Sequence, residues 1–468
     1  MKPPTVTPFL TIAEAARLIA RRQISPVELT RVLLKRIEAI DPHLNAFLLV
    51  TGQRAIAAAR AADKALAAGR KGPLLGIPVA YKDIYETAGV RTTAHSRILL
   101  DNVPKRDAET VRRLSEAGAV MLGKLATHEF AIGGPATDLP WPPARNPWDT
   151  RRFTGGSSSG AGAAVAAGLA LGALGSDTGG SIRLPAAYCG ITGLKPTPGL
   201  VSRRGVIPLA PSLDTAGPMA WTAEDCAILM DVLAGHDPED PASVPGPAVS
   251  YAKAIEAPLS GLRVGVLRHF FERDVPASPE TQRMIGDAVR VLKSLGCRVA
   301  DATLPPVAEF NGVGRVLISS EAYALHESIL RTRLSDYSRA FRIRVLSGAL
   351  IRAADYINAQ RRRTDLIAAT NETFRRFDVL ICAPTADAAP LLAEQRADEG
   401  FARPFVTTVA NVAAVPSLVV CGGFTATGLP LGLEIMGPAW SDATILRVGH
   451  HFERAAGTRT RRPELPGP

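Results

Sequence analysis

The first 70 residues show apolar positions at helical spacing, with clear signals where two of the helices begin. "TIAEAARLIA" opens with Thr11 and carries Glu14 three residues later. This Thr-x-x-Glu pattern is a capping box, in which the two side chains satisfy backbone N–H groups at the start of a helix. "SPVELTRVLLKRIEAI" places Ser25 before Pro26, a residue that suits the first position of a helix. The Ala-rich stretch "RAIAAARAADKALAAG" follows, so residues 11–70 are predicted to be helical.

Beyond residue 70, short apolar runs alternate with longer helical patterns. Short apolar runs bounded by Gly, Pro or polar residues are typical of buried strands. Strands are expected within "GPLLGIPVAYKDIY" (72–85), "AGAVMLGKLA" (117–126, after a helix end), "LRVGVLRH" (262–269), "FDVLICAPT" (377–385) and "PSLVVCGGF" (416–424). Helices are expected over 161–174, over 279–295 and over the long segment 310–376, and a loop is expected over 133–160. This alternation predicts the α/β class with an internal, largely parallel sheet.

A Pro-rich stretch, residues 235–258, is the strongest candidate for a boundary between domains. Apolar strands recur on both sides of it, so a surface crossing within one unit is the better interpretation. We therefore expect a single domain over residues 1–468. Its expected parts are N-terminal helices (1–70), a core (71–235), a helical insertion (310–376) and a C-terminal part of the sheet (377–455).

The composition is that of a globular protein, with 46% hydrophobic and 21% charged residues. The net charge of +10 suits nucleic acid or an acidic ligand. Eleven arginines but only four acidic residues lie between Arg331 and Arg376. No aromatic residues are interleaved in a way that predicts stacking on bases, so we interpret this segment as a solvated helical face and expect no nucleic-acid partner.

Cysteine and histidine usage argues against disulfides and metals. The chain has five cysteines, an odd number, and no CxxC motif, which favours reduced, buried thiols and a cytoplasmic location. The eight histidines show no metal-ligand spacing, so no metal or cofactor is expected. "MKPPTVTPFL" lacks the apolar run of a signal peptide, and residues 161–175 are too few to span a bilayer, so no membrane association is expected.

Two glycine-rich motifs must be set aside before a site is proposed. "GSSSG" (156–160) matches GxSxG formally, but the nucleophile elbow follows a strand directly, and the preceding "NPWDTRRFTG" is polar and turn-like. No Gly-Lys-Ser/Thr follows a glycine-rich run, so a phosphate-binding loop is not predicted.

Three other residues form a more specific pattern. Lys82 ends the apolar strand "GIPVAYKD", Ser157 lies in "GGSSSG", and Ser181 lies in "GSDTGGSIR". With "GGSSSGAGAAVAAG", "GSDTGGSIRLPAAYCGITGLKPT", "SLDTAGPMAWTAEDCAILMDVLAG" and "GLPLGLEIMGP" around them, the chain resembles the amidase signature family. The resemblance covers most of residues 70–235 and the C-terminal part. It implies a large mixed, mainly parallel sheet covered by helices on both faces, with residues 310–376 as a cover over the substrate.

The resemblance implies a Ser-Ser-Lys triad in place of Ser-His-Asp. Ser181 is then the nucleophile that becomes acylated, Ser157 the bridging serine after a cis peptide bond at Gly156, and Lys82 the base. Burial favours neutral lysine, so a buried lysine at the end of an apolar strand is suited to accept a proton. We expect Asp83 to face away from Lys82, because a nearby carboxylate would hold the lysine in its charged form.

The loop before Ser181 supplies closely spaced backbone N–H groups. Those of Thr178, Gly179, Gly180 and Ser181 are expected to form an oxyanion hole. Asp177 and Arg183 are expected to pair and brace the loop, a structural role, and Ser158, Ser159 and Ser176 to support the site.

The substrate is predicted from the variable segments. Candidate pocket residues are Trp141, Trp148, Tyr323, Tyr337 and Phe341, and ordinary core packing is the competing interpretation of all five. An aromatic pocket favours an aryl or hydrophobic amide, with carbamates (urethanes) or esters as further substrates. Separately, we expect a monomer or homodimer that acts on a small molecule.

Two alternatives stay open. The first is the glutaminase subunit of a tRNA-dependent amidotransferase, although members of that group typically have Gln where this chain has Leu184. The second is a non-catalytic binding protein on the same fold, which the three intact catalytic positions disfavour.

Overall fold

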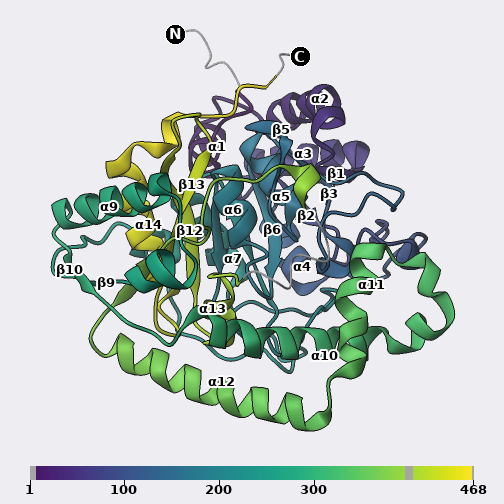
Figure 1. Ribbon diagram of the computed structural model, residues 1–468. Helices are drawn as coiled ribbons and strands as arrows, with labels where there is room; N and C mark the ends of the chain where they lie inside the picture. The colour runs from purple at the N-terminus through teal and green to yellow at the C-terminus, as the bar shows by residue number, and fades with distance from the viewer. Residues whose placement is uncertain (1–6, 396–403, 466–468) are drawn as a thin grey trace.

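An eleven-stranded mixed sheet runs through the part of the chain that the computed structural model describes, residues 7–395 and 404–465 (Figure 1). The strand order is β1-β3-β2-β6-β8-β7-β12-β13-β11-β9-β10. The strands are β1 (Phe47–Val50), β2 (Pro78–Lys82), β3 (Val120–Leu125), β6 (Gly172–Asp177), β7 (Thr192–Lys195), β8 (Thr215–Ala220), β9 (Arg263–Val266), β10 (Arg298–Asp301), β11 (Val379–Cys382), β12 (Ser417–Phe424) and β13 (Pro430–Met436). A separate hairpin pairs β4 (Arg145–Asn146) with β5 (Asp149–Phe153), within the predicted loop.

Parallel and antiparallel pairs occupy different parts of the sheet. Strand β2 pairs in parallel with β3 and β6, and β9 pairs in parallel with β10 and β11. The strands between these groups, from β6 through β8, β7, β12 and β13 to β11, pair antiparallel. The α/β class is confirmed, and antiparallel pairing in the middle of the sheet is more extensive than the sequence pattern indicated.

Helices surround the sheet. They are α1 (Ile12–Ala20), α2 (Pro26–Leu44), α3 (Gly52–Ala67), α4 (Glu109–Glu116), α5 (Ser159–Ala166), α6 (Arg183–Cys189), α7 (Ala223–Leu233), α8 (Tyr251–Ala254), α9 (Pro279–Ser294), α10 (Val307–Arg333), α11 (Arg339–Val345), α12 (Ala353–Phe374), α13 (Thr408–Val412) and α14 (Asp442–Ala456). Both predicted capping boxes are present, at Thr11 with Glu14 and at Ser25 with Glu28. The long helices α10 and α12 pack on each other at the lower edge of Figure 1.

The predicted helix over 161–174 is wrong in its second half. Helix α5 ends at Ala166, and residues 172–177 form strand β6. Gly168 has φ +66°, a left-handed conformation that stops the helix and that glycine adopts without steric cost. The Ala- and Gly-rich sequence carries no periodicity that separates a buried helix from a buried strand. The misassigned residues include the strand that leads into the Ser181 loop.

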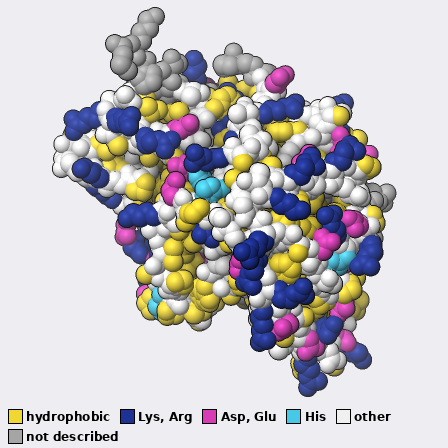
Figure 2. Space-filling view, turned by 90° about the vertical axis from the view of Figure 1, so that its left-hand side faces the viewer, with side chains coloured by type: hydrophobic (Ala, Val, Ile, Leu, Met, Phe, Trp, Pro, Cys, Tyr) yellow, Lys and Arg dark blue, Asp and Glu magenta, His cyan; other side chains and the backbone are white. Residues whose placement is uncertain are grey.

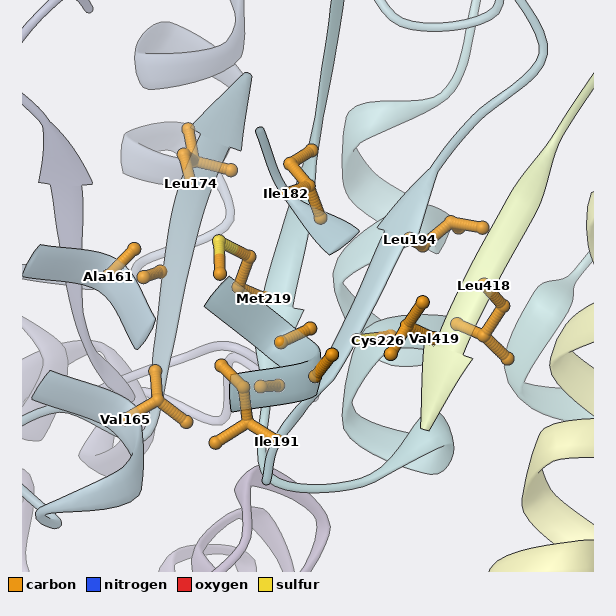
Figure 3. Packing of buried hydrophobic residues seen from close by; sticks show 14 of the residues in the cluster. Ala161, Val165, Leu174, Ile182, Ile191, Leu194, Met219, Cys226, Leu418 and Val419 are labelled. Atoms are coloured by element: carbon orange, nitrogen blue, oxygen red, sulfur yellow. The ribbon is translucent and has the colours of Figure 1, made fainter. Parts of the chain in front are cut away.

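The core lies on both sides of β6, β7, β8 and β12. Figure 3 shows Leu174, Ile182 and Met219 close together, with Leu194 and Leu418 on neighbouring strands. Ile182 is fully buried, although it follows Ser181 directly in the chain. The nucleophile candidate is therefore attached to one of the most tightly packed parts of the molecule.

On the face that Figure 2 shows, surface charge is dispersed rather than gathered. Figure 2 shows Lys and Arg side chains interspersed with acidic and apolar ones over the face in view. Many of the arginines form ion pairs with nearby carboxylates, such as Arg352 with Asp355 and Arg362 with Glu309. Among the described residues, none of the helices is both long and apolar enough to cross a membrane.

Candidate active site

Lys82 is the last residue of β2 and is fully buried. Its Nζ donates hydrogen bonds to Ser157 Oγ at 2.7 Å and to Ser176 Oγ at 2.8 Å. Burial lowers the pKa of Lys82 to about 7, with the charges of Asp177 and Asp214 opposing part of that effect. The geometry therefore joins a lysine that is partly neutral near pH 7 to two hydroxyl groups.

Ser157 follows the cis peptide bond Gly156–Ser157. Its carbonyl accepts a hydrogen bond from the His128 N–H at 3.1 Å. The His128 ring lies directly on Gly156, because a Cβ added there would be 2.1 Å from His128 Cε1. Only glycine fits at position 156, and burial holds His128 neutral by lowering its pKa to about 3.

Ser181 lies in the loop between β6 and α6 and is half-buried. Its carbonyl accepts from the Ser158 N–H at 3.1 Å, which joins its loop to the one that carries Ser157. Within the described residues its hydroxyl has no hydrogen-bond partner. The structure thus brings Lys82 and Ser157 into contact and places Ser181 in the adjoining loop without a hydrogen bond between the two serine hydroxyls.

Asp177 and Arg183 form a buried, two-pronged ion pair below this loop. Arg183 Nε lies 3.0 Å from Asp177 Oδ2, and one terminal nitrogen lies 2.9 Å from Oδ1. Arg183 also donates to Glu434 at 2.6 Å and to Asn411 at 2.6 Å. Burial would raise the pKa of Asp177, but the charge of Arg183 and the hydrogen bonds from Arg183 and Asn411 outweigh it and lower that pKa.

The carboxylate of Asp177 also binds the loop backbone. Gly180 N–H donates to Asp177 Oδ1 at 2.8 Å, and Ile182 N–H donates to Oδ2 at 3.1 Å. The N–H of Gly180 is therefore occupied. Those of Thr178, Gly179 and Ser181 donate to no acceptor in the described part of the chain, so they are the groups available to an oxyanion.

Asp83 faces away from Lys82, as expected. Its Oδ2 accepts from the backbone N–H of Thr93 at 2.9 Å and from its hydroxyl at 2.5 Å, and its Oδ1 lies 3.5 Å from Lys124 Nζ. Both Asp83 and Lys124 are buried. Asp83, which follows Lys82 in the sequence, is thus paired with a different lysine, Lys124.

The predicted aromatic pocket residues are dispersed. Tyr337 and Phe341 stack at 4.6 Å within a buried cluster that also contains Phe130 and His326. Tyr323 is half-buried beside the turn that follows α11.

The two tryptophans lie elsewhere. Trp148 donates from its ring N–H to the Cys189 carbonyl at 2.9 Å, and Trp141 packs edge-on against His95. Neither lines the cavity described next, and neither do Tyr323, Tyr337 and Phe341. A role in substrate binding for these five residues stays a prediction.

A cavity of about 250 Å³ opens beside Ser176, the second hydroxyl partner of Lys82. Its lining mixes apolar residues, such as Ile84 and Ile207, with charged ones. The charged lining residues are Arg203, Arg204, Asp214, Glu239 and Asp240. In the described residues no group of three or more His, Cys, Asp or Glu side chains is placed to hold a metal ion.

The comparisons with known proteins identify the class. The amidase family model matches residues 28–446. The chain therefore belongs to the amidase signature family and is an enzyme that cleaves amide C–N bonds.

Three relatives show which members of the family the chain is similar to. A glutamyl-tRNA(Gln) amidotransferase subunit from Roseiflexus castenholzii is 41% identical, over 97% of this chain and 98% of that protein. The solved structure of the corresponding subunit from Thermotoga maritima has a TM-score of 0.83 at 31% identity, covering 98% of each chain. The peptide amidase from Stenotrophomonas maltophilia has a TM-score of 0.84 at 30% identity, covering 98% of this chain and 99% of that one.

These relatives overturn two predictions. The aryl or hydrophobic amide, with carbamates or esters as further substrates, is wrong as the main assignment, because the curated relatives are amidotransferase subunits. The predicted monomer or homodimer that takes only a small molecule and no nucleic acid is also wrong, because those relatives are named as one subunit of an enzyme for glutamyl-tRNA(Gln). An aromatic residue in a variable segment does not distinguish core packing from a pocket, and this is why the substrate prediction failed.

The sequence gives no signal for several contacts around the site. Asn411 and Glu434 bind Arg183 from more than 200 residues downstream, and Thr407 Oγ1 donates to the Gly179 carbonyl at 2.9 Å. Thr407 and Asn411 lie in none of the motifs quoted above, and Glu434 lies in "GLPLGLEIMGP", which does not indicate its contact with Arg183. These contacts become visible only in the folded structure, where α13, the residue before it and β13 lie against the loop that carries Ser181.

Proposed function

We propose that the chain is the glutaminase subunit of a glutamyl-tRNA(Gln) amidotransferase and releases ammonia from the side-chain amide of glutamine. Its partners are then the other subunits of that enzyme and, through them, the charged tRNA. The observation that carries the chemistry is the buried contact between Lys82 Nζ and Ser157 Oγ. The full-length similarity to the amidotransferase relatives supports the choice of glutamine.

The proposed reaction uses Lys82, Ser157 and Ser181. Ser181 Oγ attacks the carbon of the amide, and its proton passes through Ser157 Oγ to Lys82 Nζ. The protonated lysine returns that proton to the departing nitrogen, and ammonia leaves. Water then hydrolyses the glutamyl ester on Ser181 by the same relay, giving glutamate and the free enzyme.

The loop stabilises the negative oxygen of the tetrahedral intermediate in this scheme. The free N–H groups of Thr178, Gly179 and Ser181 are the donors, and the Asp177–Arg183 pair holds their loop in place. Gly180, whose N–H is bound to Asp177, contributes through its backbone conformation.

The cavity beside Ser176 has a lining that suits a small, charged substrate, although Ser181 itself is not part of that lining. Free glutamine carries a carboxylate and an ammonium group, which require a cation and an anion as partners. Arg203 and Asp240 provide both kinds of charge in the lining. A cavity with this lining suits an amino acid better than an aryl acyl group.

A cytoplasmic location is part of the same proposal. The five cysteines are all buried and free of disulfides, which supports a reducing compartment. Glutamyl-tRNA is also found where translation takes place.

The test measures ammonia and glutamate release from glutamine, with the chain alone and with the partner subunits of the amidotransferase. We expect glutaminase activity in the assembled enzyme and its loss in Ser181→Ala. Ser159→Ala is the matched control, because Ser159 begins α5 two residues after Ser157, and within the described residues its hydroxyl donates only to the Ala126 carbonyl, at 3.3 Å. Other primary amides are assayed in parallel, since Leu184 replaces the glutamine typical of the amidotransferase group.

Two results would contradict the proposal. The first is turnover of another primary amide with no release of ammonia from glutamine in any combination of subunits. The second is glutaminase activity that survives in Ser181→Ala.

A further inference from the structure

The peptide unit between Gly179 and Gly180 is held at both of its polar ends. The Gly180 N–H donates to Asp177 Oδ1 at 2.8 Å, and the Gly179 carbonyl accepts from Thr407 Oγ1 at 2.9 Å. These two bonds together set the plane of the peptide, which lies immediately before Ser181.

This peptide unit needs external support because neither residue has a side chain. Gly180 has φ +125°, a conformation that L side chains rarely adopt. Without a bond to its carbonyl, this Gly–Gly peptide would be held only by the Gly180 N–H bond to Asp177. Rotation would break the Gly180 N–H bond to Asp177 and turn the Gly179 carbonyl toward that carboxylate, which would disturb the loop that carries the N–H groups of Gly179 and Ser181.

Thr407 is rigidly placed for this task. It is fully buried, and a Cβ added at Gly180 would be 2.1 Å from its hydroxyl oxygen. It directly precedes α13, and Asn411 of that helix donates to Asp177 Oδ1 at 2.9 Å. The hydroxyl and the carboxylate that hold the two ends of the peptide are therefore themselves connected.

We propose that Thr407 is a positioning residue, which orients the Gly179–Gly180 peptide so that the neighbouring N–H groups face the oxyanion formed at Ser181. This inference rests on Ser181 as the nucleophile, but it does not depend on glutamine as the substrate. Thr408 is the natural comparison, because its hydroxyl lies 3.5 Å from the same carbonyl, at the limit of a hydrogen bond.

The test compares Thr407→Val, Thr407→Ser and Thr408→Val by the rate at which a fluorophosphonate labels Ser181. Phosphonylation places a negative oxygen in the same position as the tetrahedral intermediate, and it needs no knowledge of the natural substrate. We expect Thr407→Val to label about ten- to a hundredfold more slowly, somewhat less than the loss of a direct oxyanion donor. Thr407→Ser keeps the hydroxyl. The labelling rates of Thr407→Ser and Thr408→Val should both lie within about threefold of the wild-type rate.

Steady-state turnover of any amide substrate provides a second readout. We expect kcat to fall in Thr407→Val while KM changes little, because the contact acts on the intermediate rather than on bound substrate. Melting temperatures show whether each variant is folded. If Thr407→Val does not fold, Thr407→Ala, which also lacks the hydroxyl, takes its place.

The inference is overturned if Thr407→Val labels at the wild-type rate. It is also overturned if Thr407→Val and Thr408→Val slow labelling equally, since that result indicates packing alone. Absence of wild-type labelling at Ser181 removes the nucleophile and this inference together. Labelling without any glutaminase activity contradicts the proposed substrate and leaves the role of Thr407 standing.

Discussion

At the scale of single residues, the site depends on how burial changes charged groups. Lys82 is fully buried and has two hydroxyl partners, whereas Arg183 is equally buried but bonded to Asp177, Glu434 and Asn411. The lysine therefore gives up its proton readily, and the arginine keeps its charge. The surroundings of each side chain, and not residue type alone, thus make Lys82 a base and Arg183 a structural cation.

The first prediction concerns the pH dependence that follows from Lys82. Its pKa of about 7 lies below the ordinary value of 10.5, so the neutral base forms as pH rises through about 7. We expect kcat/KM to rise about tenfold per pH unit below that value and to level off above it. Measuring kcat/KM from about pH 5 to 10 checks this.

Two lysine variants distinguish the source of this dependence. Lys82→Ala should lose activity and the inflection together. Lys195→Met is the control, because Lys195 is also buried with a pKa lowered to about 7, yet its Nζ donates to the Pro196 carbonyl rather than to a serine. An inflection of comparable size in Lys82→Ala would show that another group is the base.

At the scale of elements, close packing of strands places Ser181. Ile182 packs where β6, β7 and β8 meet, and each strand presents a glycine to it. A Cβ added at Gly175, Gly193 or Gly217 would be 2.8 to 3.0 Å from the Ile182 side chain. The strands thus form a recess that receives Ile182, and the preceding serine is fixed by the same contact.

The second prediction tests this recess. A methyl group in Gly193→Ala would be 2.8 Å from Ile182 Cγ2 and 2.9 Å from Ala186 Cβ. We expect it to lower the free energy of unfolding by about 1–3 kcal/mol, as overpacking does, and to slow labelling of Ser181. Urea unfolding and fluorophosphonate labelling measure the two effects.

Gly312→Ala is the matched control for this substitution. Gly312 is exposed in α10, and a Cβ there meets nothing within 4 Å. We expect a gain of up to about 1 kcal/mol, because alanine has the higher helix propensity, and no change in labelling. Equal effects of the two substitutions would contradict the role given to the recess.

At the scale of the whole molecule, segments far apart in sequence close the fold. Residues near both termini lie together at the top of Figure 1, where Arg462 donates to the Phe9 carbonyl at 3.2 Å. The Arg462 guanidinium also lies 3.3 Å from the centre of the Trp221 ring, and it donates to the Val165 carbonyl in α5 at 3.3 Å. One side chain therefore joins the C-terminal segment to the N-terminal segment and to the core.

The third prediction concerns this closure. Arg462→Ala should lower the free energy of unfolding by about 1–2 kcal/mol, because a partly desolvated cation–π contact and two hydrogen bonds are lost. Arg461→Ala is the control, since Arg461 is exposed and its guanidinium lies 4.9 Å from the Phe424 ring, and about 0.5–1 kcal/mol is expected for it. Thermal unfolding compares the two variants. A larger loss of unfolding free energy in Arg461→Ala than in Arg462→Ala would contradict the role given to Arg462.

The sequence by itself determined the features that depend on neighbours along the chain. The capping boxes at Thr11 and Ser25 located the starts of α1 and α2, because capping involves residues only three apart. The motifs around Lys82, Ser157 and Ser181 indicated the amidase signature family, and apolar runs indicated an α/β fold.

Only the tertiary structure decided the rest. Strand β6 was not distinguishable from a helix, because an Ala- and Gly-rich segment takes its form from the strands beside it. Thr407, Asn411 and Glu434 reach the nucleophile loop from the C-terminal part of the chain, and no local pattern marks such contacts. The sequence did not show that Tyr337 and Phe341 stack on each other in the interior, and their role in substrate binding stays a prediction. Local motifs carry the chemistry in this protein, whereas long-range packing decides which groups surround it.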